Sequence, residues 1–258
     1  MSTATRRRTI LLSLEIITPL VLVALWWFTT ASSTSAMNPS LASIAERFAG
    51  NWFGEKFVTE FIPSLGRMLG GYGLAILLGV GGGLLLGLSA FLRRLTSPLV
   101  SFLRSIPGAA LLPPAVLLLG VGPSMKIAII CFVCLWPILL NTIDGIDETH
   151  ATMTNTAKVL AIKGARRFFQ ITVPAASPRI FAGMRTSLAL ALIMLVISEM
   201  IASTDGLGFF ILRAQRTFDT ADMWSGIILL GLLGYVLTLI FTLVERVVLR
   251  WYLDSKNR

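Results

Sequence analysis

The sequence has few charged residues and lacks the motifs of the common enzyme classes. Charged residues make up 14% of the 258 positions, whereas hydrophobic residues make up 55%. A soluble domain carries roughly 25% charged residues, so this composition excludes an ordinary soluble domain and indicates an integral membrane protein. No G-x-x-x-x-G-K-[ST] phosphate loop occurs, so the chain is not expected to hydrolyse ATP itself. No Ser-His-Asp, H-E-x-x-H or paired-carboxylate constellation occurs either, which argues against an enzyme.

Histidine and cysteine are also scarce, which limits metal and redox chemistry. His150 is the single histidine, and it stands in a polar segment where we expect it to be solvated. Cys131 and Cys134 form a C-x-x-C in an apolar stretch, but no further cysteine or histidine lies nearby. We therefore expect two small membrane-buried residues and no bound metal. Few charges interrupt the apolar stretches, so a proton-relay pump is disfavoured, and uphill transport would need energy from a partner.

Six apolar stretches are long enough to cross a membrane, which predicts an all-α integral membrane protein with six transmembrane helices. They lie at residues 10–29, 65–91, 98–121, 126–142, 185–202 and 223–248. The first spans about 30 Å at 1.5 Å per residue, so we expect an uncleaved span and not a signal peptide. Pro107, Pro113 and Pro114 predict that the third is broken. Residues 31–61 are expected to form an outer loop with an interfacial helix.

The basic residues predict the orientation. On this layout, fourteen of the 22 Lys and Arg residues fall on the side of the termini and the polar loop, and six fall on the opposite side. Because cytoplasmic segments carry the excess of Lys and Arg, both termini are predicted to be cytoplasmic. The net charge of +9 therefore does not indicate a nucleic-acid partner or an anionic solute, since most of it faces the cytosol.

Small residues predict a close helix contact in the second stretch. Gly79, Gly83 and Gly87 recur every four residues, and Gly66 and Gly70 lie earlier at the same spacing. Such a face lets another backbone approach closely, which is how helices associate in lipid. The pattern fits a tightly packed helix of a moving transporter, and it fits a merely well-packed helix equally well.

Four polar residues are candidates for lining a pathway: Arg104, Asn141, Ser198 and Glu199. Glu199 lies near the outer end of the fifth stretch, where a charge is costly unless it faces water or a partner. Arg185 is fourteen residues earlier, about 21 Å along a helix, so the two cannot pair within that helix. Glu199 is predicted either to line or gate the pathway or to make structural hydrogen bonds.

The longest polar interruption lies at residues 144–184, between the fourth and fifth stretches. Residues 152–170 contain no proline and one glycine, and their apolar residues recur at three- and four-residue steps. This period is typical of a helix with one apolar face. Pro174 and Pro178 are expected to break the helix. The segment is therefore predicted to be a helical hairpin-like loop offered to a cytosolic partner.

This loop resembles the cytoplasmic loop of ABC-importer permeases, whose pattern is Glu-Ala-Ala, three residues, Gly, nine residues, Ile-x-Leu-Pro. The sequence has Asn155-Thr156-Ala157, then Ala161, then Ile171-Thr172-Val173-Pro174, with Asn155 in place of the Glu and Ala161 in place of the Gly. The flanking segments are SLGRMLGGYGLAILLGVGGGLLLG, LRSIPGAALLPPAVLLLGVGPSMKI, PAASPRIFAGMR and SEMIASTDGLGFFI. With them, residues 63–250 resemble the permease subunit of the nitrate, sulfonate and taurine class.

The resemblance implies a type I ABC-importer permease fold, with residues 1–258 as one permease domain in a prokaryotic inner membrane. Such permeases pair, here as an expected homodimer; each binds a cytosolic ATPase subunit through this loop, and a substrate-binding protein docks outside. The ATPase subunits would bind ATP and Mg²⁺, and this chain would bind no cofactor or metal directly. The residues implied in ATPase coupling are Asn155, Thr156, Ala157, Ala161, Gly164, Ile171, Val173 and Pro174.

The implied solute is a sulfonate, taurine, nitrate or a similar small molecule. An ATP-independent channel or secondary carrier is the first alternative, and a nucleotide-binding subunit that co-purifies with the chain would exclude it. A membrane scaffold without a pathway is the second, and transport of a solute into vesicles would exclude that.

Overall fold

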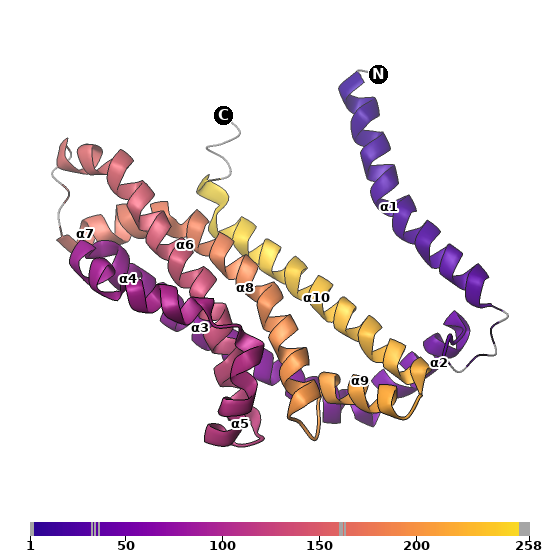
Figure 1. Cartoon of the computed structure of the whole chain (residues 1–258). Helices are drawn as coiled ribbons and strands as arrows, with labels where there is room; N and C mark the ends of the chain where they lie inside the picture. Colours follow the sequence, from indigo (N-terminus) through magenta and orange to yellow (C-terminus); the bar gives the residue numbers. More distant parts are fainter. Residues whose placement is uncertain are drawn as a thin grey trace. The chain divides into compact units, whose positions relative to one another are not determined.

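The chain folds into helices joined by short loops (Figure 1). The computed structural model describes residues 3–31, 33, 35, 37–159, 162 and 164–252, and within these ranges it describes side chains for all but residues 3–16 and 149–159. No strand occurs among the described residues. The chain divides into two compact units. The larger comprises Val58–Phe209 and Leu230–Arg258, and the smaller comprises Met1–Phe57 and Phe210–Leu229.

The helices follow one another along the chain with few long connections. They are α1 (Thr3–Thr30), α2 (Leu41–Trp52), α3 (Ile62–Leu88), α4 (Ala90–Ser105), α5 (Leu112–Leu119), α6 (Pro123–Val159), α7 (Gly164–Arg167), α8 (Val173–Ile201), α9 (Leu207–Arg216) and α10 (Thr220–Val248). Two π-helical turns, η1 (Phe57–Phe61) and η3 (Phe168–Thr172), precede α3 and α8, and a 3-10 turn, η2 (Gly108–Leu111), precedes α5.

Four helical segments among the described residues are long and apolar enough to cross a membrane. They are Phe57–Leu88, Pro123–Glu148, Gly164–Ile201 and Thr220–Val248. A fifth results if Ala90–Ser105 and Gly108–Leu119, which bend by 85°, are counted as one broken span. The described part of α1 adds a shorter apolar helix, Ile17–Thr30. The fold is therefore all-helical with four or five candidate spans.

Pro107 accounts for the bend between α4 and α5. Ile106, the residue before it, has ψ of 120°, the extended conformation that a following proline favours. Pro113 and Pro114 cause no second break, because they lie in the first turn of α5, where a backbone N–H has no helical partner to lose.

Helices α3, α6 and α8 form the core of the larger unit, and they lie side by side in Figure 1. Glycines of α3 bring its backbone against α6. A Cβ at Gly83 would lie 2.5 Å from Thr142 Cβ and 2.9 Å from the Leu139 carbonyl oxygen, and Gly79 and Gly87 face Ile138 and Ile146 in the same way. We call this contact the glycine seam.

The seam extends toward the chain start beyond Gly79. Gly71 and Ala75 continue the four-residue spacing, and a Cβ at Gly71 would lie 2.7 Å from Ile130 Cβ. A Cβ at Gly66 would have nothing within 4 Å, and one at Gly70 would meet only the Ile127 side chain at 3.5 Å. Gly66 and Gly70 have the same four-residue spacing, but they do not belong to the seam, because they lie one residue out of step with the row of Gly71 and Ala75.

Helices α6 and α8 are joined by a reciprocal pair of hydrogen bonds. The Ser187 hydroxyl donates to the Cys134 carbonyl at 2.7 Å, and the Cys134 thiol donates to the Ser187 carbonyl at 3.2 Å. A Cβ at Gly183 would lie 2.7 Å from the Pro137 carbonyl oxygen. The two backbones therefore also approach closely here. Cys131 and Cys134 are both buried free thiols.

Both α6 and α8 extend beyond the stretches expected from hydropathy. α6 continues past residue 142 to Val159, and α8 begins at Val173 and not near residue 185. The expectation that Pro174 and Pro178 break the helix is wrong. Pro174 lies in the first turn of α8, where a helix tolerates proline. Pro178 has no N–H to donate to the Pro174 carbonyl, and the Ser177 hydroxyl donates to that carbonyl instead, at 2.6 Å.

The smaller unit contains a polar network that joins α2 to the first turn of α10. α2 begins after Ser40, whose hydroxyl accepts a hydrogen bond from the Ser43 N–H at 3.2 Å. At the other end of α2, the buried Asn51 donates to Asp222 at 2.9 Å and to Ser225 at 3.2 Å. The expected outer loop therefore contains a helix, and one end of that helix is held by hydrogen bonds.

Candidate functional site

The polar segment between α6 and α8 contains an interruption that the sequence pattern did not indicate. Ile162 lies outside any helix, and Gly164 has φ of +60°, a left-handed conformation that glycine adopts without strain. α7, η3 and α8 follow directly. This part of the segment therefore consists of the end of α6, a break and α7, and not of one continuous helix. We call this part of the molecule, where α6 ends and α8 begins, the hairpin end.

The hairpin end presents aromatic surface. Phe169 is exposed, and its ring lies edge-to-face with that of Phe168, with 4.9 Å between centroids. Ile171, Pro174 and Trp251 line a shallow pocket of about 450 Å³ nearby. An exposed aromatic ring beside a shallow pocket is typical of a surface that meets another protein.

Three ion pairs join the helices at the hairpin end. Arg179 of α8 binds Glu148 of α6 through both Nε and Nη2, and Arg93 of α4 pairs with Asp147 of α6. The third pair is between Arg185 of α8 and Glu245 of α10. The base of the hairpin is thus tied to the helices on three sides.

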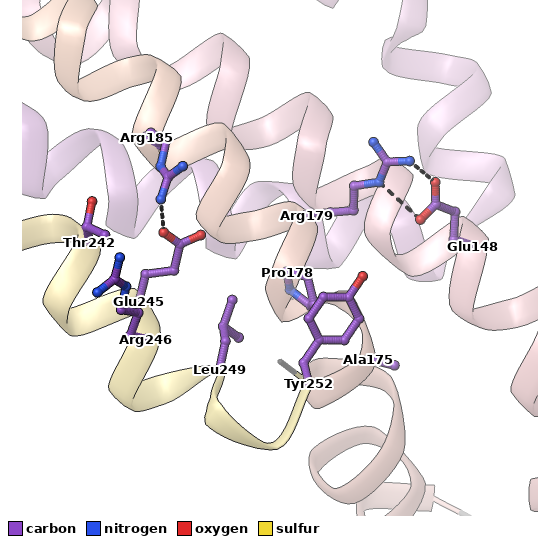
Figure 2. Close-up of a pocket in the computed structure, with 10 residues that line it drawn as sticks. All are labelled: Glu148, Ala175, Pro178, Arg179, Arg185, Thr242, Glu245, Arg246, Leu249 and Tyr252. Carbon is purple, nitrogen blue, oxygen red and sulfur yellow. Dashed lines mark hydrogen bonds and ion pairs between the residues drawn. The ribbon is translucent and has the colours of Figure 1, made fainter. Parts of the chain in front are cut away.

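A cavity of about 710 Å³ opens among α6, α8 and α10 at the same end (Figure 2). The Arg179–Glu148 and Arg185–Glu245 pairs both line it, and Tyr252 lies beside Pro178. Arg246 adds a third guanidinium group to the lining. The cavity therefore combines charged groups with an apolar lining of about equal extent.

At the opposite end of α8, Glu199 is fully buried and surrounded by hydrogen-bond donors. The Ser64 hydroxyl lies 2.8 Å from both carboxylate oxygens, and Arg67 Nη1 lies 2.9 Å from Oε1. Arg67 also pairs with Asp205 at 2.5 Å. This cluster of Ser64, Arg67, Glu199 and Asp205, which we call the carboxylate cluster, satisfies a buried charge that would otherwise be costly.

The carboxylate cluster also holds the start of α9. Three successive N–H groups, which have no partner within a helix, donate to side chains of the preceding elements. Gly206 donates to Glu60 at 2.6 Å, Leu207 to Ser64 at 2.8 Å, and Gly208 to Glu199 at 3.0 Å. Gly206 has φ of +110°, and a Cβ there or at Gly208 would collide with Glu199. The segment therefore needs glycine at both positions. Carboxylates at a helix start are also favoured by its dipole.

Helix α4 presents a polar face to a groove of about 250 Å³ that is also bounded by α3 and α6. Thr96, Ser97, Ser101 and Arg104 lie along it, and Arg104 is exposed. Hydroxyl and guanidinium groups in this arrangement offer hydrogen-bond donors at three- and four-residue steps.

The sequence from residue 71 to residue 253 matches the family described as "Binding-protein-dependent transport system inner membrane component". The chain belongs to this family. It is accordingly a multi-pass membrane protein and the permease component of a transporter, and in such systems ATP is hydrolysed by separate subunits.

Similar permeases come from several bacteria. A probable ABC transporter permease protein of Brucella melitensis is 30% identical over 87% of this chain and 92% of its own length. The putative aliphatic sulfonates transport permease protein SsuC of Bacillus subtilis is 29% identical over 90% of this chain and 85% of its own length. The nitrate import permease protein NrtB of Synechocystis is 31% identical over 73% and 69%.

The fold has a counterpart among solved structures. A chain of the methionine ABC transporter MetNI in an inward-facing conformation superposes with a TM-score of 0.65. It is 18% identical, and the match covers 73% of this chain and 94% of that chain. The larger part of the permease therefore has the helical fold of an ABC-importer permease.

The residues implied in ATPase coupling lie along the hairpin of the permease, as far as they are described. The backbones of Asn155, Thr156 and Ala157 belong to α6, and Ala161 lies outside the described residues. Gly164 begins α7, Ile171 lies in η3, and Val173 and Pro174 begin α8.

The four candidate pathway residues are not brought together into one site in the permease. Ser198 and Glu199 lie in the last turn of α8, and the Ser198 hydroxyl donates to the Leu195 carbonyl. Asn141 lies against Gly183, sixteen residues or about 24 Å along α8 from Glu199, and it donates to the Pro137 carbonyl at 2.8 Å. Arg104 is on α4. The Glu199 carboxylate accepts hydrogen bonds from Ser64, Arg67 and Gly208, so it is held firmly within the fold.

The residues that hold Glu199 and the start of α9 were not recognised in the sequence. Glu60, Ser64 and Arg67 stand four and then three residues apart, which places them on one helical face. A polar face next to an apolar stretch, continued by Gly71 of the seam, is the signal that could have identified them. Arg185, which cannot reach Glu199, instead pairs with Glu245.

Proposed function

We propose that two copies of this chain form the membrane pathway of an importer that is driven by cytosolic ATPase subunits and fed by an extracytoplasmic binding protein. The observation that carries the proposal is the family match, which extends from the glycine seam through the hairpin to the end of α10. The likeness of the fold to a permease of an ABC importer supports it independently of sequence identity.

We propose six membrane crossings with both termini in the cytoplasm. The four long apolar helices, the bent pair of α4 and α5, and the apolar part of α1 supply the six segments. The excess of basic residues on the side of the hairpin supports this orientation. The permease would then span the membrane as one domain over residues 1–258.

The hairpin end is the proposed docking surface for the ATPase subunit. A short helix seated in a partner's groove transmits rigid-body motion when its base is firmly attached. The Arg179–Glu148 and Arg185–Glu245 pairs provide such an attachment, and exposed Phe169 offers an apolar contact. ATP and Mg²⁺ would bind to the partner. The residues proposed for the coupling contact are Asn155, Thr156, Ala157, Ala161, Gly164, Ile171, Val173 and Pro174.

The proposed solute is a small oxyanion such as a sulfonate, taurine or nitrate. Similar permeases carry the names of sulfonate and nitrate systems. Within this chain, the groove beside α4 supports the proposal, because exposed Arg104 and the hydroxyls of Ser97 and Ser101 are donors suited to sulfonate or nitrate oxygens.

Reconstitution tests this function. The permease, its ATPase subunit and its binding protein are incorporated into vesicles, and uptake of labelled taurine and of nitrate is measured with and without ATP. ATP-dependent uptake that also requires the binding protein is the expected result. Uptake without ATP would favour a channel or secondary carrier, and no uptake of any solute would favour a scaffold.

A further inference from the structure

The cavity among α6, α8 and α10 lies at the depth where a membrane changes from hydrocarbon to headgroups. Exposed apolar side chains continue along α10 through Leu239, Leu243 and Val247. Trp251 and Tyr252 follow directly and are partly exposed. Aromatic rings of this kind gather at the boundary between the acyl chains and the headgroups. Since Tyr252 itself lines the cavity, the cavity opens at headgroup depth.

The cavity has one more positive than negative side chain. Arg179, Arg185 and Arg246 face Glu148 and Glu245, and the two carboxylates are each bound to one guanidinium group. Arg246 is exposed and has no hydrogen bond or ion pair with the residues that the structure describes. Among the described side chains that line the cavity, positive charges therefore outnumber negative charges by one.

The guanidinium groups also have N–H donors that bind no acceptor among the residues that the structure describes. Each arginine has five. Arg179 donates to Glu148 through Nε and one Nη2 hydrogen, and Arg185 donates to Glu245 through one Nη2 hydrogen. The N–H groups of Arg246 have no acceptor among the described residues. Guanidinium groups bind phosphate oxygens through paired N–H donors. The cavity thus matches a phosphate group in both donors and charge.

The charge balance selects among phosphate compounds. A phosphodiester carries one negative charge and balances the single excess positive charge, whereas a nucleotide would bring several charges to a site that already holds two carboxylates. Leu249 and Pro178 add an apolar wall, against which the glycerol and the first carbons of an acyl chain would rest. Basic cavities between membrane helices at this depth are suited to anionic lipid headgroups.

We propose that this cavity binds the headgroup of an anionic phospholipid, with its phosphodiester against Arg246, whose guanidinium group lines the cavity together with those of Arg179 and Arg185 (Figure 2). The proposal goes beyond the proposed transport function, because it requires only that α8 and α10 cross the membrane. On the proposed orientation, the lipid belongs to the cytoplasmic leaflet.

The test measures lipid retained by the assembled transporter. The complex is purified in detergent, titrated with phosphatidylglycerol or phosphatidylcholine, and bound lipid per permease copy is counted by native mass spectrometry. The unaltered protein is expected to retain phosphatidylglycerol in preference to phosphatidylcholine. Arg246→Gln should weaken phosphatidylglycerol binding roughly five-fold, the effect of one arginine near a membrane surface. Arg94→Gln is the matched control, because Arg94 is an exposed arginine outside the cavity.

Each outcome decides the proposal. Equal retention by Arg246→Gln and Arg94→Gln would overturn it, and so would equal retention of the two lipids by the unaltered protein, a measurement that depends on no variant. Inorganic phosphate at millimolar concentration is the remaining arm. If phosphate displaces phosphatidylglycerol, the acyl chains contribute nothing and the site is one for free phosphate; if it does not, the ligand is the lipid.

Discussion

The glycine seam makes a sharp prediction about Gly83. Replacing it with alanine places a methyl group 2.5 Å from Thr142 Cβ, 2.8 Å from Thr142 Cγ2 and 2.9 Å from the Leu139 carbonyl oxygen. Real Cβ atoms do not approach their neighbours this closely. None of these atoms is the end of a long flexible side chain, so the clash is relieved only if α3 and α6 move apart.

The cost follows from how the seam is built. Overpacking of a filled core typically costs about 1–3 kcal/mol. Separating the helices at Gly83 also loosens the contacts of Gly79 with Ile138 and of Gly87 with Ile146, so we expect about 3 kcal/mol. Gly81→Ala is the control: a Cβ there has nothing within 4 Å, and alanine is the better helix former by roughly 0.5–1 kcal/mol.

The measurement is thermal unfolding of the purified permease in detergent. For a chain of this length, each kcal/mol shifts Tm by about 2–4 °C, so Gly83→Ala should melt roughly 6–12 °C below the unaltered protein. Gly81→Ala should melt at or slightly above it. If the two variants melt together, the backbones of α3 and α6 are not in close contact, and the reasoning from the seam fails.

Three further predictions concern the cluster, the hairpin and the orientation. Glu199→Gln removes the charge partner of buried Arg67 and should destabilise the permease by about 3–5 kcal/mol; unchanged thermal stability together with altered uptake would instead support a pathway role. Ala161→Asp should leave permease assembly intact but abolish ATPase binding or uncouple hydrolysis from uptake, and normal transport with the ATPase bound would show that this loop is not the coupling element. In a background without other cysteines, Gln215→Cys should react with an impermeant thiol reagent in intact cells and His150→Cys should not; the opposite pattern reverses the orientation.

The membrane class and the glycine seam could be predicted from the sequence because both are local properties. An apolar run has a length that can be counted, and Gly79, Gly83 and Gly87 share a face at four-residue spacing. The extension of the seam was not predicted, because only glycines were considered. Ala75 is small enough to occupy the same row, and once it is included the row leads to Gly71.

The sequence shows the polar face that carries Ser64 and Arg67, but it could not show that this face meets Glu199, because the two are distant in sequence. Arg67 and Glu199 are 132 positions apart, and no local pattern links them. The continuation of α8 through Pro178 was missed for a different reason. Proline ordinarily ends a helix, and the hydroxyl of Ser177 that compensates for its missing N–H is recognisable only in the folded backbone.

The seam also decides where this permease has freedom to bend. If α3 slid along α6, Thr142 and Ile146 would leave the spaces above Gly83 and Gly87 and would meet residues with side chains. Because such clashes oppose sliding, α3, α6 and α8 are expected to move together as one rigid group. The Ile106–Pro107 peptide lies at an 85° corner, where Pro107 lacks the N–H that would continue the helical hydrogen bonds. The corner is itself packed, because a Cβ at the next residue, Gly108, would lie 2.2 Å from Val133 Cγ2 of α6. We therefore expect α3, α6 and α8 of this permease to move as one rigid group, and any bending to occur at the corner between α4 and α5.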